Sequence, residues 1–487
     1  MTQTQNIVQA PCGRFQGFSD QGVEQFLGMR YAQPPVGEGR FRPPRPIAAH
    51  GDLIDATQFG DRNYQVGQPE MFNDLFDLPG GESEDCLFLN IFRPESVQAP
   101  LPVLIWIHGG AFIGGSGNQY NPANLVRQND VIVVTFNYRL GIFGFINLAP
   151  LGADRAGSAN LGLQDQIAAL TWVRENIAAF GGDASNITVF GESAGAASVL
   201  ALLASETAGG LFQRAMAFSG AETLAPPMPH LELLKPRLGV DSDRQVLDRL
   251  MGLSGQELTE LQQTLRMYHG PALDGAVLTR RTCDAMQTGW ASEVPIIIGS
   301  TRDEGTLLAP GFTEFEHEGL ALLLGLSASI GLDDGSEYGA FLDERFAPSD
   351  LTGRVSQAWV DTFRSSALRV ASTASQHGAG GWVYSFDVET EHELGTTHGS
   401  DVPFIFNLTR EGRPVFLVHP PTESNIRLAG QWSQTLVEFA RTGDPNGKGL
   451  PQWLPYEAPD FHCLRLSRTP ELVSNPDGDM LKIYRVS

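Results

Sequence analysis

The sequence predicts an α/β protein in which a mostly parallel sheet carries helices on both faces. One observation is the run LPVLIWI at 101–107, which is apolar, partly β-branched and followed by His-Gly-Gly, as expected of a buried central strand entering a loop. A second is segment 163–180, where apolar residues recur every three or four positions, as on one face of a helix, before two glycines end the pattern. The third is a short strand at 187–190. Strand, helix and strand at this spacing indicate βαβ units.

Four further apolar runs extend the predicted sheet beyond residue 380. Each is short, and the later ones end in Gly, Ser or Asp. These runs are 131–136, 215–218, 294–298 and 382–386. Two other segments, 225–266 and 312–380, are expected to be helical material inserted over one end of the sheet. Because no repeat or long linker divides the chain, residues 1–487 are expected to form one domain with a helical cap.

Composition and charge narrow the classes of function. The chain has 487 residues, 42% of them hydrophobic, which is ample for a large core. Its 33 Lys and Arg against 56 Asp and Glu give a formal charge of −23, which repels nucleic-acid phosphates and anionic lipid surfaces. We therefore expect no nucleic-acid partner and no membrane partner.

Location and redox state are predicted from the N-terminus and the cysteines. The first ten residues are polar and lack the basic and apolar regions of a secretory signal, and no apolar run reaches the length of a bilayer span. The four cysteines lie far apart, without a CxxC pair or histidines at ligand spacing, so neither a disulfide scaffold nor a metal site is indicated. A cytoplasmic protein with reduced cysteines is expected.

A candidate nucleophile lies in the sequence GESAG at 191–195. The match to G-x-S-x-G is weak by itself, but it directly follows the strand ITVF and precedes a run of good helix formers at 194–204. Such a strand, turn and helix hold a serine above the sheet edge on a turn that only glycine can flank. The alternative, a Gly-Ser turn without chemistry, fits this context poorly. Ser193 is the predicted nucleophile.

A candidate oxyanion hole follows the strand at 101–107, where the sequence reads HGGAF. Small residues are needed there because backbone N–H groups must approach the oxygen on which negative charge develops. Gly110 and Ala111 are the predicted donors, with Ala194, which follows the nucleophile, as the third. A phosphate-binding loop is the alternative, but neither GxxxxGKS nor GxGxxG is present here.

Together with the segments around them, these motifs closely resemble the type-B carboxylesterase and cholinesterase family, which has the α/β-hydrolase fold. The resemblance covers nearly the whole chain, in the order expected of the family. Its segments are FLGMRYAQPPVGEGRFRPP at 26–44, SEDCLFLNIF at 83–92, NYRLG at 137–141, NLGLQDQ at 160–166, FGGDASNITVFGESAG at 180–195, FSG at 218–220, RDEG at 302–305, HGSDVPFIF at 398–406 and ARTGDPN at 440–446.

The resemblance implies the remaining members of a catalytic triad. In this family the acid lies in the DEG motif, which gives Glu304, with its neighbour Asp303 as the first alternative. The base lies in an H-x-x-[DE]-x-x-F segment, which gives His398. Of the other histidines, His108 is the strongest rival, but it belongs to the oxyanion loop. Glu192 matches a family position associated with the electrostatics of the site.

The chain also departs from its relatives. Many secreted members pair the cysteine of EDCL with one about thirty residues upstream, but 62–67 contains none, so Cys86 is expected to be a buried free thiol. The choline-binding aromatic residues of cholinesterases are incomplete, because Phe76 occupies the position of the key Trp and Leu307 replaces an aromatic after DEG. A specific choline-ester role is not expected.

The predicted function is therefore a serine carboxylesterase, of the kind found in bacteria, that acts on esters of small or aromatic alcohols through an acyl-enzyme. No cofactor or metal is needed for this chemistry, and the expected partner is a small ester. Two alternatives stay open: a specialised hydrolase of carbamate, pyrethroid, lactone-like or toxin esters, and a non-catalytic scaffold on the same fold. The sequence sets neither the natural ester nor the oligomeric state.

Overall fold

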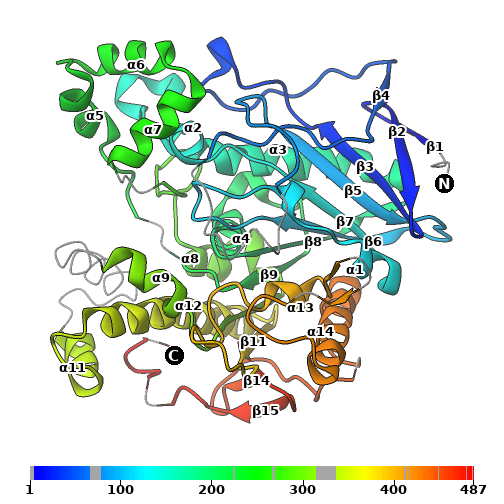
Figure 1. The fold of residues 1–487 in the computed structure, drawn as a ribbon, viewed down its shortest axis with the longest axis vertical. Helices are drawn as coiled ribbons and strands as arrows, with labels where there is room; N and C mark the ends of the chain where they lie inside the picture. The colour runs from blue at the N-terminus through cyan, green and yellow to red at the C-terminus, as the bar shows by residue number, and fades with distance from the viewer. Residues whose placement is uncertain are drawn as a thin grey trace. The chain divides into compact units, whose positions relative to one another are not determined.

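The computed structural model describes residues 5–65, 78–222, 225–265, 269–313, 336–410, 413–414, 416–447, 449–478, 480–484 and 486. The chain divides into two compact units, drawn in Figure 1. The first comprises Met1–Gln213 and Leu224–Arg281, and the second comprises Arg214–Thr223 and Thr282–Ser487. The sequence prediction of one domain over 1–487 stays a prediction.

A mixed sheet forms the centre of the first unit. Its strands lie in the order β1 (Gln5–Ala10), β2 (Gly13–Asp20), β3 (Val23–Arg30), β5 (Phe88–Pro94), β7 (Ile132–Phe136), β6 (Leu101–Ile107) and β8 (Gly182–Glu192), and β4 (Leu53–Asp55) pairs with β2. The N-terminal strands up to β7 pair antiparallel, apart from β4, whereas β6 is parallel to both β7 and β8. The prediction of a buried central strand at 101–107 is confirmed, since β6 has these bounds and six of its seven residues are buried.

The register of β6 against β8 decides where two candidate motifs lie. Ile107, the last residue of β6, pairs with Gly191 near the end of β8. Because the two strands are parallel, the loop that begins at His108 and the turn at Ser193 leave the sheet side by side at its carboxyl edge. The predicted strand at 187–190 is thus longer than expected, because it begins at Gly182.

Helices accompany this sheet in the first unit. They are α1 (Ala123–Asn129), α2 (Gly141–Phe145), α3 (Leu161–Asn176), α4 (Ala194–Ala204), α5 (His230–Leu238), α6 (Asp243–Gly252) and α7 (Gly255–Leu265). The helix predicted at 163–180 is α3, which begins two residues earlier and continues as a short 3-10 turn at Ile177–Phe180. Gly181, with φ of 85°, ends it in a left-handed conformation that favours glycine.

Helices α5, α6 and α7, which lie together in Figure 1, fall within the segment 225–266 that was expected to be helical; its role as an insertion over one end of the sheet stays a prediction. Their apolar faces bury a cluster with α2 and the N-terminal region; its members are Phe41, Ile142, Phe143, Ile146, Leu148, Leu161, Leu231, Leu234, Val246, Leu247, Leu250 and Leu258. Arg40 fixes the end of α6 by donating to the carbonyl groups of Leu250 at 3.0 Å and Leu253 at 2.7 Å. These helices therefore pack against the rest of the first unit through a shared apolar cluster.

The second unit contains a parallel set of strands. In order these are β9 (Arg214–Phe218), β10 (Ile296–Thr301), β11 (Gly381–Phe386) and β14 (His462–Leu466), followed by antiparallel β15 (Glu471–Ser474); a hairpin joins β12 (Thr409–Arg410) to β13 (Arg413–Pro414). The prediction that the sheet continues past residue 380 is confirmed by β11 and β14. The predicted strand at 294–298 is shifted, since β10 extends through Gly299-Ser300-Thr301. Those residues look like a turn in the sequence, but Gly299 is packed so closely that a Cβ would lie 2.2 Å from the Tyr384 carbonyl oxygen.

Helices of the second unit are α8 (Thr282–Thr288), α9 (Gly305–Phe312), α11 (Ser336–Arg345), α12 (Leu351–Gln376), α13 (Val402–Ile405) and α14 (Glu423–Thr442). The helical content predicted for 312–380 is confirmed by α11 and α12, while its part at 314–335 lies outside the described residues. Helix α12 is 26 residues long and contributes side chains along its length to the interior of this unit.

Candidate active site

Ser193 occupies a strained turn between β8 and α4. Its backbone has φ of 57° and ψ of −123°, a conformation that a residue with a side chain rarely adopts. A Cβ on Gly195 would lie 2.0 Å from the Ile107 carbonyl oxygen, and one on Gly191 would lie 2.6 Å from the Gly195 carbonyl carbon. Both flanking positions therefore require glycine. The predicted strand, turn and helix are confirmed, and strain concentrated at one serine is typical of a functional residue.

Helix α4 begins directly after this serine. The Ser193 carbonyl accepts the first helical hydrogen bond, from the Ala197 N–H at 2.9 Å. The N–H groups of the first helical turn, including that of Ala194, have no acceptor within the helix and carry the positive end of its dipole. A negative charge that develops at Ser193 is thus stabilised by the helix that follows it.

The predicted oxyanion loop has an unusual backbone. Gly110, Ala111 and Phe112 all have positive φ, at 110°, 53° and 60°. The Gly110 carbonyl accepts from the N–H groups of Ile113 at 3.0 Å and Gly114 at 2.9 Å, which closes a tight turn. A Cβ on Gly109 would lie 3.1 Å from the Cβ of Ser193. The loop backbone therefore lies against the nucleophile turn; its donors, Gly110, Ala111 and Ala194, stay predictions.

His108, the rival candidate for the base, has a structural role in this loop. It is buried, its Nδ1 contacts the Gly109 carbonyl at 2.9 Å, and its ring stacks on Tyr138 with centroids 4.4 Å apart. The Tyr138 hydroxyl donates to the His108 carbonyl at 3.0 Å. Burial lowers the pKa of His108 to about 4, so the ring is neutral at pH 7.

Glu192 is the last residue of β8, directly before the nucleophile, and it is buried. Its Oε2 is 2.9 Å from the place where a Gly109 Cβ would lie, so the absence of a side chain at that glycine leaves room for the carboxylate. Burial, and then the charge of Glu192, raise the pKa of Tyr120. The influence of Glu192 on the electrostatics of the site itself stays a prediction.

In the second unit, His398 and Glu304 form a buried pair. The Nδ1 atom of His398 lies 2.5 Å from Oε2 of Glu304. Glu304 follows the end of β10 and is completely buried. The other carboxylate oxygen accepts from the Ser219 hydroxyl at 2.5 Å and from the Thr301 N–H at 2.7 Å. With Oε1 held by two donors, Oε2 is directed at the imidazole. A carboxylate on Nδ1 selects the tautomer in which Nε2 accepts a proton, as a general base requires.

The carboxylate of Asp303, the alternative acid, binds groups other than His398. Its Oδ2 accepts from the Thr396 N–H at 2.8 Å and from the Arg302 guanidinium at 2.9 Å. Among the described residues, the carboxylate in contact with Nδ1 of His398 is that of Glu304. The geometry thus favours Glu304, the residue that the sequence predicts.

Two further groups pack around His398. The ring of Phe363, on α12, stacks on the imidazole with centroids 5.1 Å apart. Asp401 is completely buried and accepts from the Tyr384 hydroxyl at 2.8 Å. Burial raises the pKa of Asp401 to about 6, with the charge of Glu304 adding to the effect.

Sequence reasoning missed the roles of Ser219 and Phe363. Ser219 lies in the FSG segment of the family resemblance, and its positive φ of 52° marks a constrained turn. No motif marks Phe363, which lies 35 positions before the histidine in the middle of a helix. Only the position of Phe363 on the face of α12 that contacts His398 could have identified this residue.

The predicted site residues are therefore found in two groups. Ser193, Gly110, Ala111 and Ala194 belong to the first unit, and Glu304 and His398 to the second. The contact between Ser193 and His398 that would join them stays a prediction. Cys86 is a buried free thiol as predicted, and Phe76 lies outside the described residues.

Within the described part of the chain, no group of three or more His, Cys, Asp or Glu side chains could hold a metal ion. In that same part, no helix combines the length and the apolar character needed to cross a bilayer.

Comparison with known proteins finds relatives of this chain among esterases. The model of the Carboxylesterase family matches residues 4–329 and 337–481. The para-nitrobenzyl esterase of Bacillus subtilis is 35% identical over 98% of this chain and 98% of its own length. The fumonisin B1 esterase of Sphingopyxis macrogoltabida is 34% identical over 89% of this chain and 82% of its own length.

Solved structures give the same result for the fold. A carboxylesterase of Geobacillus stearothermophilus, solved at pH 6.2, has a TM-score of 0.84 at 35% identity and covers 98% of this chain and 99% of its own. A thermophilic PNB esterase has a TM-score of 0.85 at 34% identity, covering 99% and 100%. The predicted α/β-hydrolase fold is confirmed.

Proposed function

The chain belongs to the carboxylesterase family, and we propose that it hydrolyses carboxylic esters through Ser193, His398 and Glu304. The observation that carries the assignment is the buried contact of 2.5 Å between His398 Nδ1 and Glu304. It gives the histidine the tautomer and the counter-charge of a general base. The strained backbone at Ser193 supports its role as nucleophile.

In the first half of the reaction, the Ser193 hydroxyl attacks the ester carbonyl carbon while its proton passes to Nε2 of His398. The resulting imidazolium is stabilised by the Glu304 carboxylate. The negative charge on the former carbonyl oxygen is held by the N–H groups of Gly110, Ala111 and Ala194. Collapse of this intermediate breaks the bond to the alcohol, which leaves with the proton from His398, and an acyl-enzyme remains.

In the second half, His398 takes a proton from water as the water oxygen attacks the acyl carbon. The second tetrahedral intermediate uses the same oxyanion donors. Its collapse returns the proton to Ser193 and releases the carboxylic acid. Each turnover thus consumes one ester and one water, yields one alcohol and one acid, and requires neither a metal nor a cofactor.

The substrates are proposed to be small esters, including those of aromatic alcohols. One relative is named for a para-nitrobenzyl ester and another for fumonisin B1, so closely similar chains carry names that imply different esters. A specialised role towards a carbamate, pyrethroid or toxin ester is therefore the second candidate. We propose no preference for choline esters, because Phe76 stands in place of the family's key Trp and Leu307 in place of an aromatic residue.

The setting of the enzyme is proposed on charge and cysteine chemistry. The formal charge of −23 disfavours nucleic acids and anionic lipids as partners. Buried free thiols at Cys12, Cys86 and Cys463 are compatible with the reducing cytoplasm. Residues 1–487 are proposed to act as one catalytic domain.

A chromogenic butyrate ester tests the function directly. Ser193→Ala is expected to lose nearly all turnover, because only binding and oxyanion stabilisation would remain, while its melting temperature stays close to that of the wild type. Ser185→Ala, which removes an exposed serine hydroxyl from β8, the strand before the Ser193 turn, is the matched control and should keep full activity. Wild-type protein without turnover on a panel of acyl lengths would favour the non-catalytic scaffold. Turnover by Ser193→Ala above about 1% would contradict the assigned nucleophile.

A further inference from the structure

The acid turn is the backbone at 302–304, which carries Glu304, and the histidine loop is the chain at 387–398, which carries His398. The two run in register. Strands β10 and β11 run parallel, with Thr301 opposite Phe386, and the Arg302 N–H continues the ladder to the Phe386 carbonyl at 3.1 Å. The chain after β11 then departs as a loop at 387–395 and returns. On its return, Asp303 and Thr397 form an isolated parallel bridge. Glu304 directly follows Asp303, and His398 directly follows Thr397. This bridge therefore sets the proposed acid beside the proposed base.

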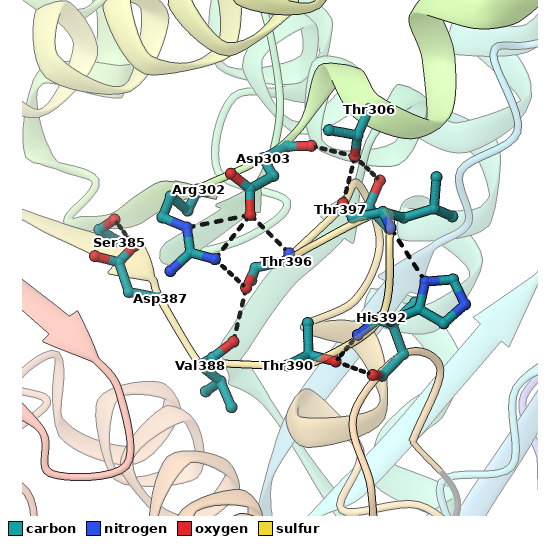
Figure 2. Close-up of polar contacts among 12 residues, drawn as sticks. Arg302, Asp303, Thr306, Ser385, Asp387, Val388, Thr390, His392, Thr396 and Thr397 are labelled. Carbon is teal, nitrogen blue, oxygen red and sulfur yellow. Dashed lines mark hydrogen bonds and ion pairs between the residues drawn. The ribbon is translucent and has the colours of Figure 1, made fainter.

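The side chain of Asp303 reinforces this bridge. Its own N–H donates to the Thr396 carbonyl at 3.0 Å, and its Oδ2 accepts from the Thr396 N–H at 2.8 Å, so one residue holds both polar groups of the other. Figure 2 shows the Arg302 guanidinium on the same carboxylate, where Nε and Nη2 lie 3.1 Å and 2.9 Å from Oδ2. Gly395 has φ of 61°, and a Cβ there would lie 2.4 Å from Oδ2. The loop is therefore shaped to admit this carboxylate.

Two threonine hydroxyls attach the same loop to the start of α9. The Thr306 hydroxyl contacts the Asp303 carbonyl at 2.8 Å, the Leu394 carbonyl at 2.6 Å and the Thr397 hydroxyl at 2.9 Å. The Thr397 hydroxyl also accepts from the Leu307 N–H at 3.2 Å. In Figure 2, Thr306 and Thr397 face each other on one side of the Asp303 contacts.

The residues that receive these bonds directly precede the histidine. Thr396 and Thr397 are both fully buried, and the Thr396 hydroxyl donates to the Val388 carbonyl at 2.7 Å, across the neck of the loop. Because Thr396 and Thr397 are both hydrogen-bonded to neighbouring segments, a shift of this part of the loop that carries His398 with it breaks several hydrogen bonds. Loss of these bonds would therefore let His398 shift relative to Glu304.

We propose that Asp303 is a positioning residue for the reaction, which holds the histidine loop in register with the acid turn. The inference rests on the proposed roles of Glu304 and His398. The Asp303 carboxylate binds Thr396 and Arg302, so this residue acts through the bridge to Thr397. A displacement of a catalytic group by about 1 Å can cost about a hundredfold in rate, so the effect of losing this support is measurable.

The test is a double-mutant cycle between Asp303→Ala and Glu304→Gln, read as kcat and KM on the butyrate ester. If Asp303 acts through the pair, Asp303→Ala lowers kcat by about tenfold or more in the wild type, with KM changed by less than about threefold. In the Glu304→Gln background the same substitution lowers kcat by less than about threefold, because the contact it supports is already lost. Asp303→Asn, which keeps an oxygen for the Thr396 N–H, should recover most of the rate.

Asp387→Ala is the matched control. Asp387 follows the neighbouring strand β11, pairs with Arg465 at 3.2 Å and accepts from Ser385 at 2.7 Å; its side chain is 18% exposed, against 28% for Asp303. Asp387→Ala should lower the melting temperature about as much as Asp303→Ala does, and its kcat should stay within about twofold of the wild-type value.

Three outcomes would overturn the inference. They are equal losses from Asp303→Ala in both backgrounds, wild-type kcat in Asp303→Ala, and an equal loss of kcat in Asp387→Ala. If Asp303→Ala lacks a cooperative melting transition, Asp303→Asn decides: wild-type kcat in Asp303→Asn supports a role for the hydrogen-bonding oxygen, and a loss as large as that in Glu304→Gln contradicts it. Full activity of Glu304→Gln alone would instead overturn the proposed triad, and with it this inference.

Discussion

The phenyl ring of Phe363 lies nearly parallel to the imidazole of His398, with planes 16° apart and centroids separated by 5.1 Å. Glu304 holds one edge of the imidazole through Nδ1. The stacked ring of Phe363 covers a face of the same imidazole and so restrains its orientation. Helix α12 therefore supports the proposed base even though none of its residues belongs to a recognised motif.

Phe363→Leu is expected to lower kcat/KM by up to about tenfold, because an aromatic stacking contact contributes about 0.5–1.5 kcal/mol. Phe363→Tyr should keep the ring and most of the rate. Phe439→Leu removes a buried ring that packs edge-on against Trp382, far from any proposed site residue in the sequence, and is the control for lost core packing. Equal rate losses in both leucine variants would argue against a specific role for stacking.

Glu304→Gln is expected to lower kcat/KM by about a thousandfold or more, since the amide can neither select the tautomer of His398 reliably nor stabilise its positive charge. Glu389→Gln changes an exposed carboxylate in the histidine loop and should leave the rate unchanged. Steady-state kinetics on the butyrate ester measure both. A Glu304→Gln enzyme with the wild-type rate would mean that another residue is the acid.

Gly195→Ala is expected to abolish activity and lower stability, because the new methyl group would lie 2.0 Å from the Ile107 carbonyl oxygen. The control is Gly430→Ala in the middle of α14, where an added Cβ meets nothing within 4 Å. That substitution should raise stability by up to about 1 kcal/mol, as expected for alanine in a helix. Thermal melts and activity distinguish the two; a stable, active Gly195→Ala enzyme would contradict the tight turn.

The buried carboxyl group of Asp401 predicts a pH dependence of stability. Its pKa is raised from 3.8 to about 6 in the folded protein, so between these values the folded state binds more protons than the unfolded state. The stabilising effect is complete below about pH 4 and is lost as the pH rises through about 6. The difference in unfolding free energy between wild type and Asp401→Asn should therefore fall by about 2 kcal/mol from pH 4.5 to 7.5. Urea denaturation at several pH values measures it, and a constant difference would contradict the raised pKa.

Substrate charge gives a further prediction. Without the family's Trp, a quaternary ammonium loses part of the about 0.5–2 kcal/mol that an aromatic face provides. A choline ester and its uncharged 3,3-dimethylbutyl analogue, with the same acyl group, should differ by less than about tenfold in kcat/KM at moderate ionic strength. A much larger preference for choline would indicate an aromatic site built from other residues.

Local patterns predicted the fold well where one segment carries its own signal. Strand β6 and helix α4 have the predicted bounds because an uninterrupted apolar run and an alanine-rich run reflect burial directly. Strand β10 was misplaced at its end, since Gly299-Ser300-Thr301 pairs with β11, and Gly299 also with β9, so these small residues belong to the sheet rather than to a turn. Such packing depends on neighbours that are distant in the sequence.

The same distinction applies to the site. The sequence located Ser193 by its turn, and the family resemblance led to Glu304 and His398. The support that Ser219 gives to the acid was not predicted, because it depends on a contact between residues that are about a hundred positions apart. The support that Phe363 gives to the base was not predicted, because it depends on one face of a long helix. The Asp303 contacts were missed for a similar reason, since Thr396 lies 93 positions away.

The most direct test of the account is whether Ser193 is reactive and whether that reactivity depends on His398. Phenylmethylsulfonyl fluoride should modify the wild-type protein once, and peptide mass mapping should find the adduct on Ser193. In His398→Ala the same serine should remain essentially unmodified over the time that labels the wild type completely, because the base that activates it is gone. An adduct on Ser219, or equal labelling of Ser193 in both proteins, would contradict the proposed triad.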